Sequence, residues 1–308
     1  MKRLLNAPRL FGLVCAVCAV MMGLAYMAAA GAPARYLSLN VAALTLGAGA
    51  WLGLGPTAGS WLARNGQAIL ALSLPLIATA LLGAPVDGAA RWVSVGPLSV
   101  QVSLVLLPTM IVLYARGADA LGTAGIAVAA LALALQPDRG MAAALAAAMA
   151  TLLLTRPGRL PALAFAAAAS AFAATLLRPD ALPAVPFVDR ILYTAFTVHA
   201  AAGLAVLFGS LILLAPALPG ALRRERARPA LLAFGTCWAA VVAAAALGNY
   251  PTPLVGYGGS AVLGYLLSVA LLPASPRDTS TGPLPATGTV TDESRESAAL
   301  ELSALAGR

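Results

Sequence analysis

The sequence predicts an all-α membrane protein with about ten transmembrane helices and both termini in the cytoplasm. The first observation is composition: of 308 residues, 61% are hydrophobic and 10% are charged, and the mean hydropathy is +0.89. A soluble core does not use so much apolar surface. The second observation is that the apolar residues come in runs, without the alternating segments of a membrane barrel. Because backbone amides in lipid must be bonded within their own segment, each run is expected to be helical.

Clusters of glycine, proline and charge separate these runs. They cover residues 10–30, 37–54, 67–83, 100–115, 121–136, 140–155, 160–177, 191–216, 229–248 and 258–273. Several are shorter than the roughly 20 residues of a full span, so some helices are expected to be tilted, broken or extended by their flanks. The first run is longer than the apolar part of a signal peptide. We predict a retained helix there, with a signal anchor as the alternative.

The basic residues set the predicted orientation. The inside segments carry Lys2, Arg3, Arg9, Arg64, Arg116, Arg156, Arg159, Arg223, Arg224, Arg226, Arg228 and Arg277. The outside loops carry Arg35, Arg91, Arg139, Arg178 and Arg190. This asymmetry agrees with the positive-inside rule, and it explains the net charge of +8 without a nucleic-acid partner.

We interpret residues 1–273 as one polytopic transmembrane domain. The remainder, Ala274–Arg308, is rich in Ser, Thr, Pro and Gly and is predicted to be a disordered cytoplasmic tail. Its end, "ESRESAALELSALAGR", could instead form a short amphipathic helix. Cys15 and Cys18 form a C-x-x-C inside the first run, where no nearby Cys or His completes a metal site, so we expect them to be packing residues.

Polar residues collect in four loops on the predicted outer side. The loops are "APVDGAARWVSVGPLSVQVS", "QPDRG" (136–140), "LRPDALPAVPFVDR" (177–190) and "GNYPTPLVGYGGSA" (248–261). The outside acids are Asp87, Asp138, Asp180 and Asp189. A charge at the membrane boundary is costly unless it is paired, hydrated or used.

Two interpretations of these acids stay open. In the first, each pairs with a neighbouring arginine: Asp87 with Arg91, Asp138 with Arg139, and Asp189 with Arg190. In the second, the four loops line one outward-facing cavity. The proline and glycine content of 248–261 favours the second, with that loop as a re-entrant wall. Prolines there prevent a helix and glycines allow close backbone approach.

Three segments in order resemble the SEDS proteins, of the FtsW, RodA and SpoVE type. They are "DGAARWVSVGPLSVQVSLVLL", "LQPDRGMAA" and "PTPLVGYGGSAVLGYLL". The family's hallmarks are a "G…RW…G…QPSE" first periplasmic loop, an "(E/Q)PD-x-G" turn, and a "P-x-P-(F/L)-(V/I)-S-Y-G-G-S" segment entering the last helix. The resemblance covers most of Gly83 to Leu272, and it implies a SEDS-like helical bundle.

The resemblance implies a glycosyltransferase of the bacterial inner membrane. SEDS proteins polymerise lipid II into peptidoglycan at the outer face of that membrane, in cell division and cell-shape maintenance. They usually work with a class B penicillin-binding protein. A catalytically inactive scaffold that binds a lipid-linked sugar or that partner is the alternative, and a lipid II flippase is a third.

The family also implies roles for individual residues. The essential aspartate of the family carries over to Asp189, with Asp180 as the alternative. Arg91 is expected to face pyrophosphate and Trp92 to support its loop. Asp138 is expected to hold a divalent cation or to pin the cavity floor. The other candidate substrate-binding residues are Gln101, Ser103, Pro251, Pro253, Tyr257, Gly258, Gly259 and Ser260.

The sequence departs from the family pattern in its charged positions. "QPSE" is replaced by "QVSL", the loop 177–190 is short, and the glutamate pair of the eighth helix is replaced by "HAAAG". His199, the single histidine, is interpreted as locally hydrogen-bonded or solvated; the alternative is a replacement acid/base. The Ser260 hydroxyl could cap the last helix. These losses of charge keep the inactive scaffold open as a reading.

Overall fold

The computed structural model describes residues 7–83, 85, 88–96, 98–180, 182–222 and 227–273. Asp87 and the predicted tail 274–308 lie outside these residues.

Each of the predicted apolar runs is helical. The helices are α2 (Pro8–Ala29), α3 (Ala34–Gly53), α4 (Pro56–Ala63), α5 (Gly66–Leu82), α6 (Val102–Arg116), α7 (Ala120–Leu135), α8 (Arg139–Thr155), α9 (Arg159–Leu176), α10 (Ile191–Val198), α11 (Ala200–Ile212), the 3-10 turn η1 (Ala215–Ala217), α12 (Leu218–Leu222), α13 (Arg228–Leu247) and α14 (Gly259–Ala270). Within the described residues, 5 helical segments are long and apolar enough to cross a membrane, one of them being Ala200–Ala217, which joins α11 and η1; the other apolar helices are shorter. The prediction of an all-α membrane protein is confirmed, while its orientation stays a prediction.

Three local features differ from the expected pattern. A two-stranded antiparallel hairpin, β1 (Trp92–Val95) and β2 (Leu98–Gln101), occupies the first polar loop. The short helix α4 fills the connection between α3 and α5. The eighth run is not one helix, because His199 is extended and separates α10 from α11.

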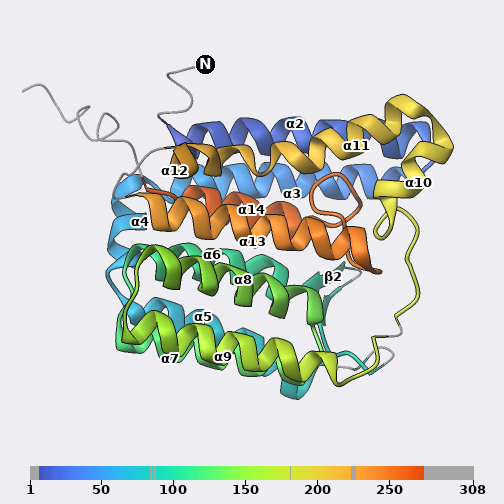
Figure 1. The fold of residues 1–308 in the computed structure, drawn as a ribbon. Coiled ribbons are helices and arrows are strands. Elements are labelled where there is room, and N and C mark those ends of the chain that lie inside the picture. Colours follow the sequence, from blue (N-terminus) through green and yellow to red (C-terminus); the bar gives the residue numbers. More distant parts are fainter. Residues whose placement is uncertain are drawn as a thin grey trace, which may run out of the picture. The chain divides into compact units, whose positions relative to one another are not determined.

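Helices α13 and α14 run between two groups of helices (Figure 1), with α2, α3 and α11 on one side and α6 and α8 on the other. Every residue of α6 from Leu107 to Ala115 is buried, whereas α3 buries only Asn40, Ala43 and Gly47. The contact between α6 and α14 is close because a Cβ on Gly264 would overlap the Leu104 carbonyl oxygen. This contact holds the start of α6 against the middle of α14.

The loop 248–258 is bound to the loop 182–190 by backbone hydrogen bonds. Thr252 N donates to Val188 O at 3.0 Å and Tyr257 N to Phe187 O at 2.7 Å. An isolated antiparallel bridge joins Asp189 to Pro251. These two of the four predicted outer loops therefore come together, although the elements from α10 to α13 separate them in the sequence.

Asn40, inside α3, fixes the end of the loop 248–258. Its Nδ2 donates to Gly256 O at 2.8 Å, and its Oδ1 accepts from Gly258 N at 3.2 Å. The side chain is fully buried, so both of its polar groups are used where water is absent. The Asn40 side-chain amide thus supplies both a donor and an acceptor to a non-helical turn, whose backbone groups have no helical hydrogen bonds.

We predict that Gly264→Ala destabilises the protein. The added methyl group meets backbone at Leu104, which cannot rotate away, and overpacking of this kind costs about 1–3 kcal/mol. Thermal unfolding in detergent should show a lower midpoint. Gly49→Ala is the matched control, because a Cβ there meets open space. Equal midpoints for the two variants would contradict the close α6–α14 contact.

We predict that Asn40→Leu loosens the loop 248–258. The substitution keeps the branched shape of the side chain but leaves Gly256 O and Gly258 N without their Asn40 partner, at a cost of about 1–3 kcal/mol for a buried polar group. Hydrogen exchange at Gly258 and limited proteolysis of the loop should both accelerate. Thr45→Val is the control, since the exposed Thr45 hydroxyl bonds only within its own helix. Unchanged exchange at Gly258 would show that Asn40 does not hold the turn.

Candidate functional site

Asp138 lies at the centre of the polar cluster. Its side chain is 1% exposed, and it caps α8 by accepting from Met141 N at 3.3 Å. The other carboxylate oxygen, Oδ2, accepts from Ser103 Oγ at 2.7 Å and from Gln101 Nε2 at 3.0 Å. These three donors come from the start of α8 and the start of α6. Asp138 therefore pins the two helices together at this end of the bundle.

Ser260 extends the cluster to α14. Its hydroxyl oxygen accepts from Gln101 N at 3.0 Å. The expectation that Ser260 caps the last helix is wrong: the N-cap of α14 is Gly258, and no side chain bonds there. The Ser260 hydroxyl instead joins the end of β2 to α14, because it accepts the hydrogen bond from the backbone N–H of Gln101.

Arg91, Asp180 and Tyr250 form a second group. Arg91 is 3% exposed and its Nη2 donates to Asp180 Oδ1 at 3.2 Å, and also to the Pro137 carbonyl. Tyr250 donates its hydroxyl hydrogen to Asp180 Oδ2, and the guanidinium lies 5.9 Å from the Tyr250 ring centroid. Asp180 has an exposed backbone, but its side chain is only 16% exposed. Burial raises the pKa of the Tyr250 phenol and the Asp180 bond raises it further, so the phenol keeps its proton and acts as a donor.

Asp189 is placed differently. It is 8% exposed, and its Oδ2 accepts from Val185 N at 2.8 Å. No other hydrogen bond to this carboxylate is found among the residues described. Burial raises the pKa of the Asp189 carboxyl above its ordinary value, against the opposing effect of the Val185 N–H. Asp189 is thus a carboxylate that holds a proton more readily than a surface aspartate does.

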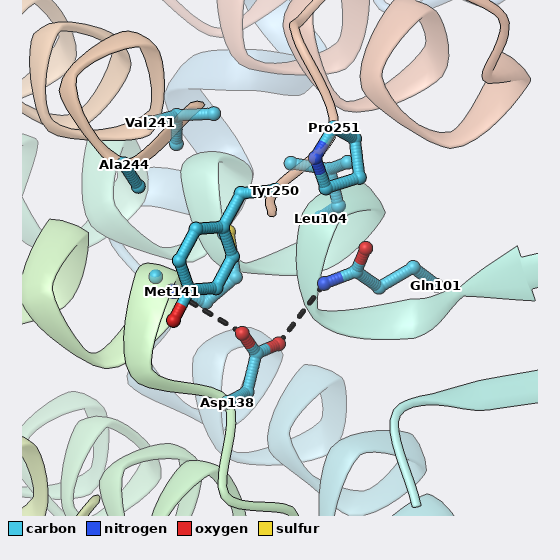
Figure 2. A pocket seen from close by; sticks show the side chains of 9 residues that line it. Gln101, Leu104, Asp138, Met141, Val241, Ala244, Tyr250 and Pro251 are labelled. Atoms are coloured by element: carbon cyan, nitrogen blue, oxygen red, sulfur yellow. Dashed lines mark hydrogen bonds between the residues drawn. The ribbon is translucent and has the colours of Figure 1, made fainter. Parts of the chain in front are cut away.

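A small hollow opens between these groups. Its lining residues are Gln101, Leu104, Asp138, Gly140, Met141, Val241, Ala244, Tyr250 and Pro251. Figure 2 shows the Tyr250 ring beside Asp138, with Gln101 and Pro251 close by. The empty space is about 260 Å³ including its open mouth, below the roughly 300–1,000 Å³ of ligand pockets.

Backbone strain gathers in the same loops. Among the described residues, the non-glycine residues with positive φ are Pro137, Phe187, Arg190 and Leu254. Each such conformation costs on the order of 1 kcal/mol or more for an L-residue. All four lie in the polar loops that meet here. Strain of this kind is common at functional sites, where the surrounding structure holds it.

The neighbouring-arginine interpretation is wrong for the pairs that can be examined. Arg139 does not pair with Asp138; its Nη2 donates to the carbonyls of Thr175 and Arg178. Asp189 bonds to Val185 N rather than to Arg190. Arg91 takes Asp180 as its ion-pair partner. The shared-cluster interpretation agrees with these contacts.

Several candidate residues lie beside the cluster rather than in the hollow. Trp92 is half-buried and opens β1 opposite Gln101. Tyr257 stacks on Tyr36, with ring centroids 3.8 Å apart. Pro253 is buried inside the loop, and a Cβ on Gly259 would meet Ala43. Their roles here are structural supports of the loop.

His199 lies outside this cluster. It is exposed, and its Nδ1 accepts from Ala201 N at 3.1 Å, so that it caps α11. This local hydrogen bond agrees with the simpler interpretation of the histidine. It also explains the helix break, because an N-cap residue must leave the helical conformation.

The residues present do not fit a divalent cation. Hard cations take several oxygen ligands, but within the described residues no group of three or more His, Cys, Asp or Glu side chains comes together. The Asp138 carboxylate is already surrounded by N–H and O–H donors. Of its two expected roles, pinning the cavity floor agrees with this geometry.

Sequence reasoning missed Asn40 and Tyr250 as site residues. Asn40 carried a signal, because an asparagine inside an apolar run is costly and usually has a partner. Tyr250 carried a weaker one, its position next to Pro251 in the loop 248–261. Its ring packs against Gly140 and Gly248, where a Cβ would come within 2.9 Å of ring atoms.

Sequence comparisons find no matching family and no matching curated protein. Structural comparison gives a clear likeness to RodA, the rod shape determining protein of Thermus thermophilus. The TM-score is 0.53 at 23% identity, over 85% of this chain and 94% of that one. An aspartate-to-alanine mutant of the same RodA gives 0.51 at 21% identity, over 85% of this chain and 95% of that one. The chain therefore has the SEDS-like fold of RodA, a multi-span helical membrane protein.

Proposed function

We propose that the chain is a divergent SEDS-type glycosyltransferase that polymerises lipid II at the outer face of the bacterial inner membrane. The observation that carries the proposal is the meeting of polar loops at one hollow, which is lined by Gln101, Asp138, Tyr250 and Pro251 among others. Asp180 and Arg91 contact the Tyr250 side chain, and the Asp189 backbone bridges to Pro251. The RodA-like fold supports it as an analogy. A class B penicillin-binding protein is the proposed partner.

The reaction sets two requirements. The acceptor 4-hydroxyl oxygen attacks the anomeric carbon of the donor sugar, and the bond from that carbon to the pyrophosphate oxygen breaks. The hydroxyl proton must go to a base, and the departing undecaprenyl pyrophosphate must be stabilised. Arg91 is the proposed positive charge, because it is buried beside Tyr250, which lines the hollow, and already holds one carboxylate. A pyrophosphate oxygen would take the place of Asp180 on that guanidinium.

We assign the base to Asp189. Both oxygens of Asp180 are engaged, one by Arg91 and one by Tyr250. Asp189 Oδ1, in contrast, has no donor in the described part of the chain, and burial raises the pKa of this carboxyl. A raised pKa brings a carboxylate closer to the operating pH, where a general base is most effective. The bridge to Pro251 places the Asp189 backbone next to a residue of the hollow.

A second candidate function is an inactive scaffold that binds a lipid-linked sugar or a partner protein. It is favoured by the small hollow and by the bonds that already occupy Asp138 and Asp180. If the protein is an inactive scaffold, it binds the lipid-linked sugar or the partner protein but forms no glycan product. Polymerisation of labelled lipid II by the purified protein with its cognate penicillin-binding protein separates the two functions.

We predict that Asp189→Asn abolishes polymerisation and leaves the fold intact. Loss of a general base lowers the rate by about 10²–10⁴-fold. The amide oxygen can still accept from Val185 N, and removing a buried charge removes a cost of folding, so the unfolding temperature at neutral pH should stay equal or rise. Asp119→Asn, at the opposite end of the fold, is the activity control. A folded Asp189→Asn protein that polymerises at the wild-type rate would sink this assignment.

We predict that polymerisation falls as the pH is lowered, with a midpoint above the ordinary aspartate pKa of about 3.9. The sign follows from the site: the base acts only when ionised, and burial raises the pKa of Asp189. Ionisation is therefore lost earlier on acidification than at a surface aspartate. Initial rates across pH, on protein verified as folded, give the midpoint. A profile that is flat down to pH values near 4 would contradict the role of Asp189.

A further inference from the structure

The ion pair between Arg91 and Asp180 leaves part of the guanidinium unused. Arg91 Nη2 donates to Asp180 Oδ1 at 3.2 Å. The Arg91 Nε atom is buried and has no hydrogen-bond partner among the described residues. Buried donors are normally satisfied, so this N–H lacks an acceptor that Asp180 does not supply. A guanidinium and a carboxylate that match fully make two parallel hydrogen bonds, whereas this pair makes one.

The unused donor indicates an anion with several oxygens. The Nε–H and the Nη2 group of an arginine lie on the same side of the guanidinium, and together they form a fork that matches phosphate geometry. Arg91 Nη2 also donates to the Pro137 carbonyl, and this bond keeps the guanidinium in place when Asp180 leaves. Arg91 therefore already has the position and the free donor that a phosphate-type anion needs, and Asp180 stands where one of its oxygens would bind.

Asp180 is the partner of this ion pair that can leave. Its side chain is 16% exposed, against 4% for the Arg91 side chain. Residues 176–180 are all exposed, and α9 ends at Leu176, so no helix carries Asp180. In the described part of the chain, its carboxylate is held by two side chains, Arg91 and Tyr250. Displacing Asp180 therefore breaks the contacts of one side chain and leaves the buried arginine where it is.

Tyr250 connects the ion pair to the hollow. Its hydroxyl donates to Asp180 Oδ2, and its ring lines the hollow beside Pro251 (Figure 2). The Arg91 guanidinium lies 5.9 Å from the centroid of the same ring. The Tyr250 hydroxyl is thus a second hold on Asp180, and it is provided by a residue that a ligand in the hollow would contact.

We propose that Asp180 is a built-in competitor for an anion site at Arg91, and that a pyrophosphate group must displace it in order to bind. The inference rests on the proposed function, in which Arg91 receives the departing pyrophosphate. A competitor of this kind lowers the apparent affinity of the site in proportion to the fraction of molecules in which it is bound. A pyrophosphate can displace the Asp180 carboxylate because it carries more negative charge and can accept from Nη2 and Nε together.

Binding of inorganic pyrophosphate to the purified full-length protein tests the proposal. Isothermal titration calorimetry in a neutral detergent compares the wild type with Asp180→Asn. We expect Asp180→Asn to bind pyrophosphate about tenfold more tightly, because a neutral amide of the same size competes far less for Arg91. Asp119→Asn is the matched control, since it removes the same charge at the opposite end of the fold and should bind as the wild type does. Equal affinity in Asp180→Asn and the wild type would overturn the proposal.

Two further variants locate the effect. Tyr250→Phe removes the second hold and keeps the Asp180 charge, so it should increase the affinity for pyrophosphate by less than Asp180→Asn does. If Asp180→Asn does not fold, wild-type affinity in Tyr250→Phe overturns the proposal in its place. The double variant Arg91→Gln/Asp180→Asn should lose the gain in affinity. A gain that survives the loss of Arg91 would show that pyrophosphate binds elsewhere, and it would also overturn the proposal.

The same titration with undecaprenyl pyrophosphate, on protein in nanodiscs, separates two sources of the anion. An equal gain of Asp180→Asn for both probes identifies the lipid-linked group as a ligand, and a gain for inorganic pyrophosphate alone identifies a free anion in the same site. Neither titration depends on glycan formation. A gain without polymerisation supports the competitor and rejects the glycosyltransferase, whereas polymerisation by the wild type without any gain in Asp180→Asn rejects the competitor alone.

Discussion

The buried carboxylate of Asp138 is the constraint on which the polar end of the structure depends. An isolated carboxylate in an apolar bundle costs several kcal/mol, and it can be tolerated only with donors on its oxygens. Met141 N, Ser103 Oγ and Gln101 Nε2 supply those donors. Because they belong to two helices and the end of a hairpin, satisfying one carboxylate fixes α6 and α8 relative to each other. The backbone N–H of Gln101 in turn donates to the Ser260 hydroxyl, and this bond connects the cluster to α14.

The outer loops are organised around this fixed point by their own backbone bonds. The loop 248–258 has no helix to satisfy its amides, so it takes acceptors from the loop 182–190 and from Asn40. This arrangement brings Tyr250 and Pro251 to the hollow and holds strained residues such as Leu254 in place. Polar groups that are held rigidly in this way can stabilise charge that develops during a reaction, because they do not have to reorient.

Much of the fold could be predicted from the sequence, because apolar runs in lipid leave the backbone only the helix. The partners of the charged residues could not. Arg91 lies close in sequence to Asp87, yet it pairs with Asp180, 89 residues away. Asp138 and Arg139 are adjacent, but a helix N-cap turns the carboxylate toward the helix while Arg139 reaches the end of α9. The break at His199 was also missed, since a histidine in an apolar run gives no sign of capping geometry.

The polar loops bring charged groups, donors and acceptors together at one end of the bundle. The central claim is that the outer loops form one binding site for a lipid-linked sugar, and the direct measurement is equilibrium binding of fluorescent lipid II to the protein in nanodiscs. The account predicts saturable binding that Arg91→Gln weakens at least tenfold and that Arg35→Gln, an exposed outer arginine, leaves unchanged. Absence of saturable binding to folded wild-type protein, or equal affinity in both variants, would contradict it.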